Sequence, residues 1–101
     1  MNPQEFDQLV RVMDELPPYS RLAPLLELFS DPPPNAYLAQ EYAGQLLIRF
    51  KPPCPGPIDL ILRRVLPRWD RSVEQLPLYL REVFGPEVVI TCLDRLAEQG
   101  F

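Results

Sequence analysis

The sequence predicts an all-α protein built from five or six short helices. Apolar residues recur with helical spacing in one segment after another. Most of the 14 prolines lie at the edges of these segments, where a missing N–H group matters least. The chain has 101 residues, 47% of them apolar and 24% charged, which suits one compact domain. We therefore expect a single helical domain over residues 1–101.

The first predicted helix covers residues 3–15. Asn2 is a suitable N-cap, and Pro3 suits the first helical position because its missing N–H would have no helical partner there. The apolar stripe of this helix consists of Phe6, Leu9, Val10 and Met13. Pro17 and Pro18 follow directly, so the helix should end before them.

Two further helices are predicted over residues 21–30 and 36–50, with a proline-rich turn between them. Pro24 is tolerable in the first of these because it falls within the first turn. The stripe of this helix is Leu22, Leu25, Leu26 and Phe29. The next helix has the longest stripe of the chain, namely Ala39, Tyr42, Ala43, Leu46, Leu47 and Phe50. A stripe of this length should face a core.

The fourth and fifth predicted helices cover residues 57–66 and 72–84. The stripe of the fourth helix is Ile58, Ile61, Leu62, Val65 and Leu66. The stripe of the fifth is Val73, Leu76, Leu80, Val83 and Phe84. Asp70 or Ser72 can cap the fifth helix, because both side chains accept hydrogen bonds from free backbone N–H groups.

The last predicted helix covers residues 87–99. Its stripe is Val89, Cys92, Leu93 and Leu96. The β-branched residues 88–91 could form a strand instead. We prefer a helix, because the helical stripe continues through Leu96 and no second strand is available for pairing.

The two halves of the chain resemble each other weakly at an offset of 50 residues. The matched positions pair Leu16 with Leu66, Pro17 with Pro67, Tyr19 with Trp69, Arg21 with Arg71, Leu26 with Leu76, Leu28 with Leu78 and Leu46 with Leu96. Residues 22–50 resemble a HEAT repeat, with a proline in the first helix, an Asp–Pro turn and small residues in the second helix. Residues 76–101 keep the helix–turn–helix pattern but lack the aspartate in the turn. Ala36 and Tyr37 stand where HEAT repeats usually have Val and Arg.

The resemblance implies HEAT-like helical hairpins that present a surface to a protein partner, and the remaining possibility is an irregular helical bundle. HEAT repeats act mostly as scaffolds, so the resemblance transfers no catalytic residues. Two copies are few for such a stack, which normally needs about three repeats to bury its faces. Either the first helix caps the stack, or the chain forms a homodimer.

The inventory of reactive side chains argues against an enzyme. The chain has no histidine, only four glycines and no glycine-rich phosphate loop. Cys54 and Cys92 lack the spacing of a zinc site, and two distant cysteines do not form a disulfide framework. We therefore expect no catalytic residues, no metal and no cofactor.

The sequence also lacks the marks of a membrane or secreted protein. No apolar run approaches the roughly 18 to 20 residues that a membrane span requires. The first ten residues lack the basic and apolar regions of a signal peptide. A cytoplasmic protein that does not contact membranes is the expectation.

The strongest candidate for a binding surface is a basic region between Arg49 and Arg71. It contains six basic and two acidic residues, a net charge of +4, so the rest of the chain carries −8. The candidate partner-binding residues are Arg49, Arg63, Arg64, Arg68, Trp69 and Arg71. Arginine and tryptophan are enriched at interface hot spots, and the charge would suit an acidic partner.

Two other interpretations of this region remain open. Trp69 could fill the core while the arginines pair with acidic helices of the same chain. Nucleic acid is a weaker alternative, because the chain has one lysine and an isoelectric point of about 4.7. The segment from Arg49 to Pro55 also matches a polyproline ligand, but a connection between two helices explains its prolines better.

We therefore expect a non-catalytic protein-interaction module or adaptor that binds an acidic partner surface. The alternative is a small inhibitor of the immunity-protein or antitoxin type that blocks a partner enzyme. Small size, acidity and a lack of catalytic groups suit both functions equally. The gene of an inhibitor should lie beside the gene of its toxin, which would distinguish the two.

Overall fold

The computed structural model describes residues 3–100, and within these residues it contains helices and no strand. The helices are α1 (Pro3–Glu15), α2 (Leu22–Ser30), α3 (Ala36–Phe50), α4 (Ile58–Val65), α5 (Gln75–Phe84) and α6 (Pro86–Glu98). A short 3-10 turn, η1 (Pro18–Ser20), lies between α1 and α2. The all-α prediction is confirmed, and residues 88–91 are helical. The proposed cap Asn2 lies outside the described residues.

The fifth helix differs most from its predicted bounds, because it begins at Gln75 rather than at residue 72. The carboxylate of Asp70 accepts hydrogen bonds from both the backbone N–H (3.0 Å) and the hydroxyl (2.6 Å) of Ser72. The backbone N–H of Val73 donates to the carbonyl of Asp70. These bonds close a turn before the helix starts, so neither Asp70 nor Ser72 caps it.

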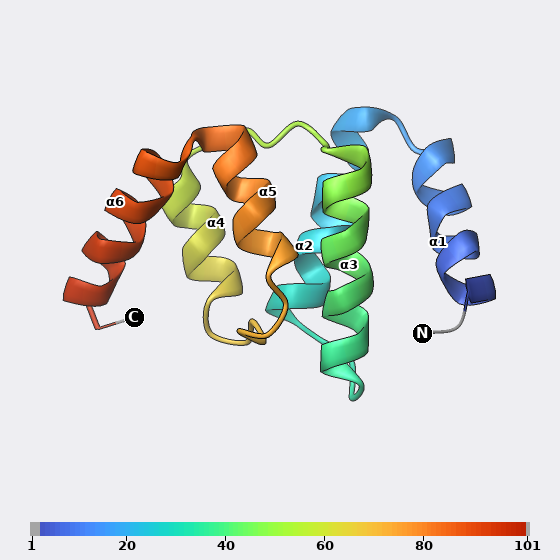
Figure 1. The fold of residues 1–101 in the computed structure, drawn as a ribbon, viewed down its shortest axis with the longest axis horizontal. Coiled ribbons are helices and arrows are strands. Elements are labelled where there is room, and N and C mark those ends of the chain that lie inside the picture. The colour runs from blue at the N-terminus through green and yellow to red at the C-terminus, as the bar shows by residue number, and fades with distance from the viewer. Residues whose placement is uncertain (1–2, 101) are drawn as a thin grey trace.

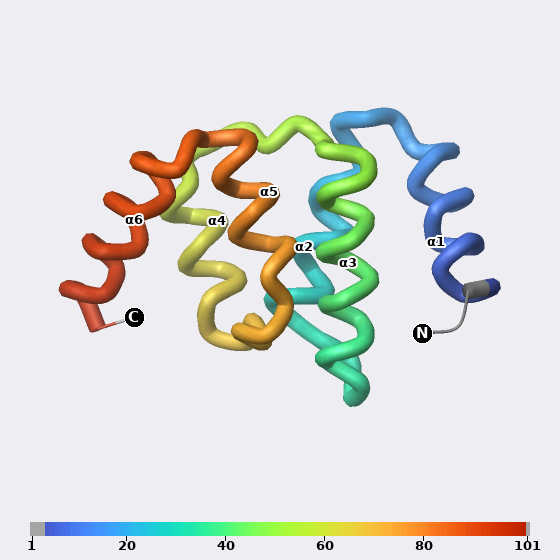
Figure 2. Tube along the Cα trace, viewed as in Figure 1, coloured from blue at the N-terminus to red at the C-terminus, as the bar shows by residue number. Residues whose placement is uncertain are grey.

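The helices form an elongated body of 42 × 28 × 17 Å. Consecutive helices pack as two pairs, α2 with α3 and α5 with α6. The pairs are joined because α3 packs on α5 and α4 packs on both α2 and α6. Figures 1 and 2 show α1 at one end of the row beyond α3 and α6 at the other end. No helix within residues 3–100 combines the length and apolar character needed to cross a membrane.

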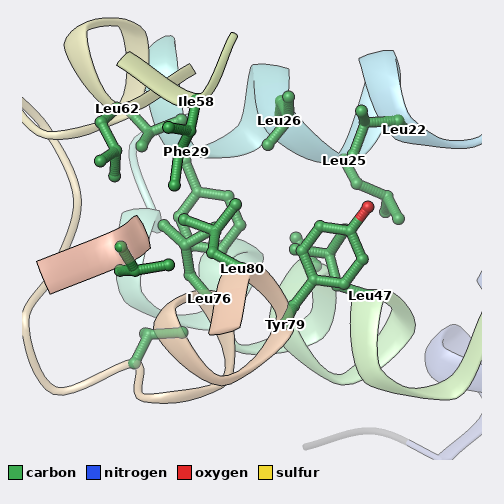
Figure 3. Close-up of a cluster of buried hydrophobic side chains, with 14 of the residues drawn as sticks. Leu22, Leu25, Leu26, Phe29, Leu47, Ile58, Leu62, Leu76, Tyr79 and Leu80 are labelled. Atoms are coloured by element: carbon green, nitrogen blue, oxygen red, sulfur yellow. The ribbon is translucent and has the colours of Figure 1, made fainter. Parts of the chain in front are cut away.

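The core runs through the middle of this row. Figure 3 shows Phe29, Leu76 and Leu80 meeting beneath α4, with Tyr79 close to Leu25. The predicted stripes supply most of the buried side chains, including Leu25, Leu26, Phe29, Leu46, Leu47, Leu62, Val65, Leu76, Leu80, Val89, Cys92 and Leu96. Val83 is an exception, since it is 38% exposed in the last turn of α5.

Tyr79 is buried although no predicted stripe contains it. Its hydroxyl donates a 2.5 Å hydrogen bond to the carbonyl of Pro52, in the connection between α3 and α4. Burial raises the pKa of Tyr79, and the neighbouring Cys54 raises it further. The phenol therefore anchors α5 to a loop that precedes it by more than twenty residues.

Gly44 of α3 lies close to the start of α5. A Cβ atom at this position would lie 2.8 Å from the Cβ of Gln75 and 3.3 Å from a methyl of Val73. Glycine is therefore required here by contact with the neighbouring helix rather than by backbone conformation.

Few contacts hold α1 against the other helices. The rings of Phe6 and Tyr42 lie 5.9 Å apart, and Met13 is the one described residue of α1 that is fully buried. The Arg21 side chain donates to the carbonyls of Met13 (2.7 Å) and Asp14 (3.3 Å) at the end of α1. The same guanidinium lies 4.9 Å above the ring of Phe50. Arg21 thus links α1 to the end of α3.

Candidate functional site

The candidate partner-binding residues fall into two groups in the structure. Arg49 lies in the last turn of α3, whereas Arg63 and Arg64 lie in the last turn of α4. Arg68, Trp69 and Arg71 follow in the connection from α4 to α5. The carboxyl ends of α3 and α4 lie at opposite edges of the molecule in Figure 1. The structure therefore groups five of the six candidates and separates Arg49. These five are called the basic edge below: Arg63, Arg64, Trp69, Arg68 and Arg71.

The two arginines of α4 connect this helix to its neighbours. The Nε of Arg64 donates to the hydroxyl of Ser30 at the end of α2, over 3.3 Å. The guanidinium of Arg63 donates to the side-chain carbonyl of Gln99, just beyond α6. The basic edge therefore spans the carboxyl ends of α2, α4 and α6.

Trp69 belongs partly to the core and partly to the surface. Its indole N–H donates to the carbonyl of Val73 over 3.0 Å, and the ring packs against the core. The guanidinium of Arg71 lies 5.1 Å above the ring. The ring closes a small apolar cavity whose other walls are Leu62, Leu76, Pro77, Leu80, Val89 and Leu93. The indole is therefore half-buried against the core, and Arg71 lies over its ring.

Gln40 positions the backbone beneath the basic edge. Its side chain is completely buried. The amide nitrogen donates to the carbonyl of Arg68 over 2.9 Å, and the amide oxygen accepts from the N–H of Asp70 over 2.7 Å. The loop on either side of Trp69 is thus attached to α3 by two part-buried hydrogen bonds from the side chain of Gln40.

The burial of Gln40 could have been predicted from its position on the helix, although Gln40 is not part of the apolar stripe. Gln40 lies three residues before Ala43 and seven before Leu47, so it occupies a core-facing position of α3. A polar side chain at such a position must find hydrogen-bond partners within the protein. Its partners come from residues 68 and 70, which helical spacing cannot reveal.

Three of the arginines in the basic edge have no ion-pair partner among the described residues. In the part of the chain that the structure describes, Arg64, Arg68 and Arg71 make no ion pair. Asp70, the nearest acidic residue in sequence, is engaged by the two hydrogen bonds from Ser72. These bonds lower the pKa of Asp70, so its carboxylate remains ionised. The three exposed guanidinium groups are available for anionic groups from outside.

Arg49 has a different environment at the opposite edge. Its guanidinium lies 6.0 Å from the centre of the Phe50 ring, and the guanidinium of Arg21 lies 4.9 Å from the same ring. Lys51, the next basic residue, forms a 3.2 Å ion pair with Glu82 of α5. This group of charges therefore joins helix ends within the molecule, and it does not extend the basic edge.

The chain was also compared with protein-family models, curated proteins and solved structures. None of them matches.

Three other features of the sequence can be located in the structure. Within the segment from Arg49 to Pro55, Pro52 is buried and its carbonyl accepts the hydrogen bond of Tyr79, whereas Pro53 and Pro55 are exposed. Burial raises the pKa of both Cys54 and Cys92, which keeps these thiols protonated at neutral pH. Among residues 3–100, no three histidine, cysteine or acidic side chains come together as a metal site would require.

Proposed function

We propose that the protein is a non-catalytic interaction module whose basic edge binds an acidic surface of another protein. The observation that supports this most directly is the exposure of Arg64, Arg68 and Arg71 at one edge of the molecule without ion-pair partners among the described residues. Guanidinium groups bind carboxylates through two parallel hydrogen bonds, which gives both affinity and orientation.

The preorganisation of the basic edge also supports this proposal. Gln40 holds the backbone at Arg68 and Asp70, and Trp69 holds Arg71 above its ring. A surface that is already ordered loses less entropy on binding. Trp69 adds an aromatic group that is partly desolvated before the partner arrives.

The charge distribution favours a protein over a nucleic acid. The chain is acidic outside the segment from Arg49 to Arg71, and this excess of negative charge would repel a phosphate backbone. The single lysine, Lys51, is paired with Glu82. The resemblance of residues 22–50 to HEAT repeats supports the same class of function, because such hairpins commonly present surfaces to proteins.

The test is affinity purification from the cells of origin, with the tagged wild type and a double variant, Arg64→Glu with Arg68→Glu. We expect the wild type to retain a protein that the double variant loses, and its binding to weaken with added salt. The matched control is Arg49→Glu with Arg81→Glu, which makes the same change in net charge on exposed arginines outside the basic edge. This control should retain the partner.

The melting temperature of the double variant should stay close to that of the wild type, because exposed charge pairs contribute about 0 to 1 kcal/mol. Unchanged affinity and salt response in the double variant would contradict the proposal. So would equal loss of binding in the control. If the captured protein is an enzyme that loses activity in the complex, the module is an inhibitor rather than an adaptor.

A further inference from the structure

Arg71 of the basic edge lines an open hollow of about 390 Å³. Among the described residues, the walls of this hollow are Leu66, Pro67, Arg71 and Gly100. They include none of the residues around the cavity that Trp69 closes. Arg71 is exposed and is the one charged residue in this set. The hollow thus presents a guanidinium group beside apolar walls.

The acidic residues around Arg71 leave its charge without a partner. Asp70 precedes it in the chain and bonds to Ser72. Glu74 lies at the start of α5, and Glu98 is the last residue of α6. No acidic residue within residues 3–100 lines the hollow or forms an ion pair with Arg71. The charge at the hollow is therefore available to a carboxylate from outside.

Trp69 fixes the position of the Arg71 side chain. The guanidinium lies 5.1 Å from the centre of the indole ring, within the range of a cation–π interaction. The ring itself is held, because its N–H donates to the carbonyl of Val73 and it packs against the core. A guanidinium that lies over an aromatic ring keeps the N–H donors along its edge for a carboxylate. Arg64 differs, since its Nε already donates to the hydroxyl of Ser30.

We propose that this hollow binds one carboxylate side chain of the acidic partner, and that Arg71 anchors it through two parallel hydrogen bonds. Trp69 is a positioning residue, because it acts on the carboxylate through Arg71. The inference rests on the proposed function and adds a geometric requirement to it. A guanidinium matches both oxygens of a carboxylate, whereas a lysine in its place offers only a point charge. Leu66 and Pro67 give the methylene groups next to the carboxylate an apolar surface.

Titration calorimetry of the full chain with hexaglutamate tests the anchor. We expect saturable binding of this peptide and none of hexaglutamine. Arg71→Lys should raise the dissociation constant about fivefold or more, because it keeps the charge but removes the paired hydrogen bonds. Arg81→Lys is the matched control, since Arg81 is exposed outside the basic edge, and it should change the constant less than about twofold. Trp69 is the only tryptophan of the chain, so its fluorescence should change over the same titration.

Two substitutions of Trp69 separate positioning from folding. Trp69→Phe and Trp69→Leu both remove the N–H that donates to Val73, so both should lower the melting temperature. Phenylalanine keeps a ring for Arg71 and should bind hexaglutamate within about threefold of the wild type. Leucine should raise the dissociation constant about fivefold or more. In an Arg71→Gln background the two variants should bind alike, because the ring then has no guanidinium to position.

Unchanged affinity in Arg71→Lys would overturn the inference, as would a wild type that does not bind hexaglutamate. A difference between the two Trp69 variants that persists in the Arg71→Gln background would contradict the positioning role. The double variant Arg64→Glu with Arg68→Glu distinguishes these failures from that of the proposed function. If it loses hexaglutamate while Arg71→Lys retains it, the basic edge binds acidic groups without this anchor. If neither change alters binding, the proposed function fails as well.

Discussion

Gln40 is the residue on which the geometry of the basic edge depends most. Its amide uses both its donor and its acceptor on the backbone of a single loop, at Arg68 and Asp70. Removing the amide would leave the part-buried carbonyl of Arg68 and N–H of Asp70 without this partner, which is more unfavourable than the loss of a fully exposed hydrogen bond. One side chain on α3 therefore determines where a loop some thirty residues away is placed.

Gln40→Met is expected to destabilise the fold by about 1 to 3 kcal/mol, because methionine fills a similar volume but satisfies neither backbone group. Urea unfolding measures the change. Gln45→Met is the matched control on the same helix, since Gln45 is only partly buried and bonds locally to Glu41. That control should change stability by no more than about 0.5 kcal/mol. Equal stability of both variants would show that the Gln40 hydrogen bonds contribute nothing.

Among the helices, α1 is the one attached by the fewest interactions. Its buried contact is Met13, and its last carbonyls are held by a side chain from outside the helix, Arg21. Free carbonyls at a helix end need partners, and a guanidinium is a strong one. The attachment of α1 thus combines the apolar side chains of Phe6, Leu9, Val10 and Met13 with the hydrogen bonds from Arg21 in the connection.

Arg21→Ala should therefore loosen α1 without affecting α3 and α5. Hydrogen exchange should show protection factors in α1 lowered about tenfold or more, while those in the other two helices stay within about threefold of the wild type. Arg11→Ala, an exposed change within α1 itself, serves as the control and should leave the protection of α1 nearly unchanged. Uniform loss of protection in all helices would show that Arg21 supports the whole fold instead.

The contact between α3 and α5 depends on Gly44. Replacing a helical glycine by alanine normally stabilises a helix by about 1 kcal/mol. Here the added Cβ would meet the Cβ of Gln75 at 2.8 Å, so Gly44→Ala should destabilise the protein by about 1 to 3 kcal/mol. Thermal unfolding measures the sign of the change directly.

The background Gln75→Gly supplies the control for Gly44→Ala, because it removes the atom with which the new Cβ collides. In that background the same substitution should be much less destabilising, or stabilising. An identical loss of stability in both backgrounds would locate the strain elsewhere.

At the scale of the whole molecule, the direction of the helices explains why arginines gather at one edge. Figure 1 shows α2, α4 and α6 running in the same direction, so their carboxyl ends lie along the edge where α4 meets the following loop. Basic residues in the last turn of a helix interact favourably with its dipole, and Arg63 and Arg64 of the basic edge are such residues in α4. The basic edge thus combines a contribution to folding with the recognition that we propose.

The stability of the whole fold should decrease at alkaline pH. Burial raises the pKa of Tyr79, so the folded state retains a proton that the unfolded chain releases above about pH 10. The contribution of Tyr79 is therefore fully present below about pH 10 and is lost as the pH rises further. Burial also raises the pKa of Cys54 and Cys92, so a further decrease should begin as the unfolded thiols ionise, at about pH 8.5 to 9.

Urea unfolding between about pH 7 and 11 measures this effect. Tyr79→Phe should be less stable than the wild type at neutral pH, since the carbonyl of Pro52 loses its partner, but should lose less stability above pH 10. Tyr19→Phe is the control, because Tyr19 is 79% exposed and should follow the wild-type profile. Parallel profiles for Tyr79→Phe and the wild type would contradict the assignment.

The sequence by itself determined the helices of this protein and most of their buried faces. Apolar periodicity and proline placement act within one or two turns, so the bounds of α3 could be predicted without tertiary information. The same local patterns placed Phe29 and Leu47 in the core. They failed at Ser72, where a side-chain turn delays the start of α5, and at Tyr79, whose partner lies in a distant loop.

Only the tertiary structure decided which side chains meet. Arg49 and Arg68 belong to one basic region in the sequence. Because α4 lies between them in the chain and runs from one edge of the molecule to the other, the two arginines lie at opposite edges. Gln40 reaches the loop at Asp70, and Arg21 reaches the end of α1, because the packing of helices brings these segments together. Such contacts depend on the direction and packing of whole helices, which local spacing along the chain does not specify.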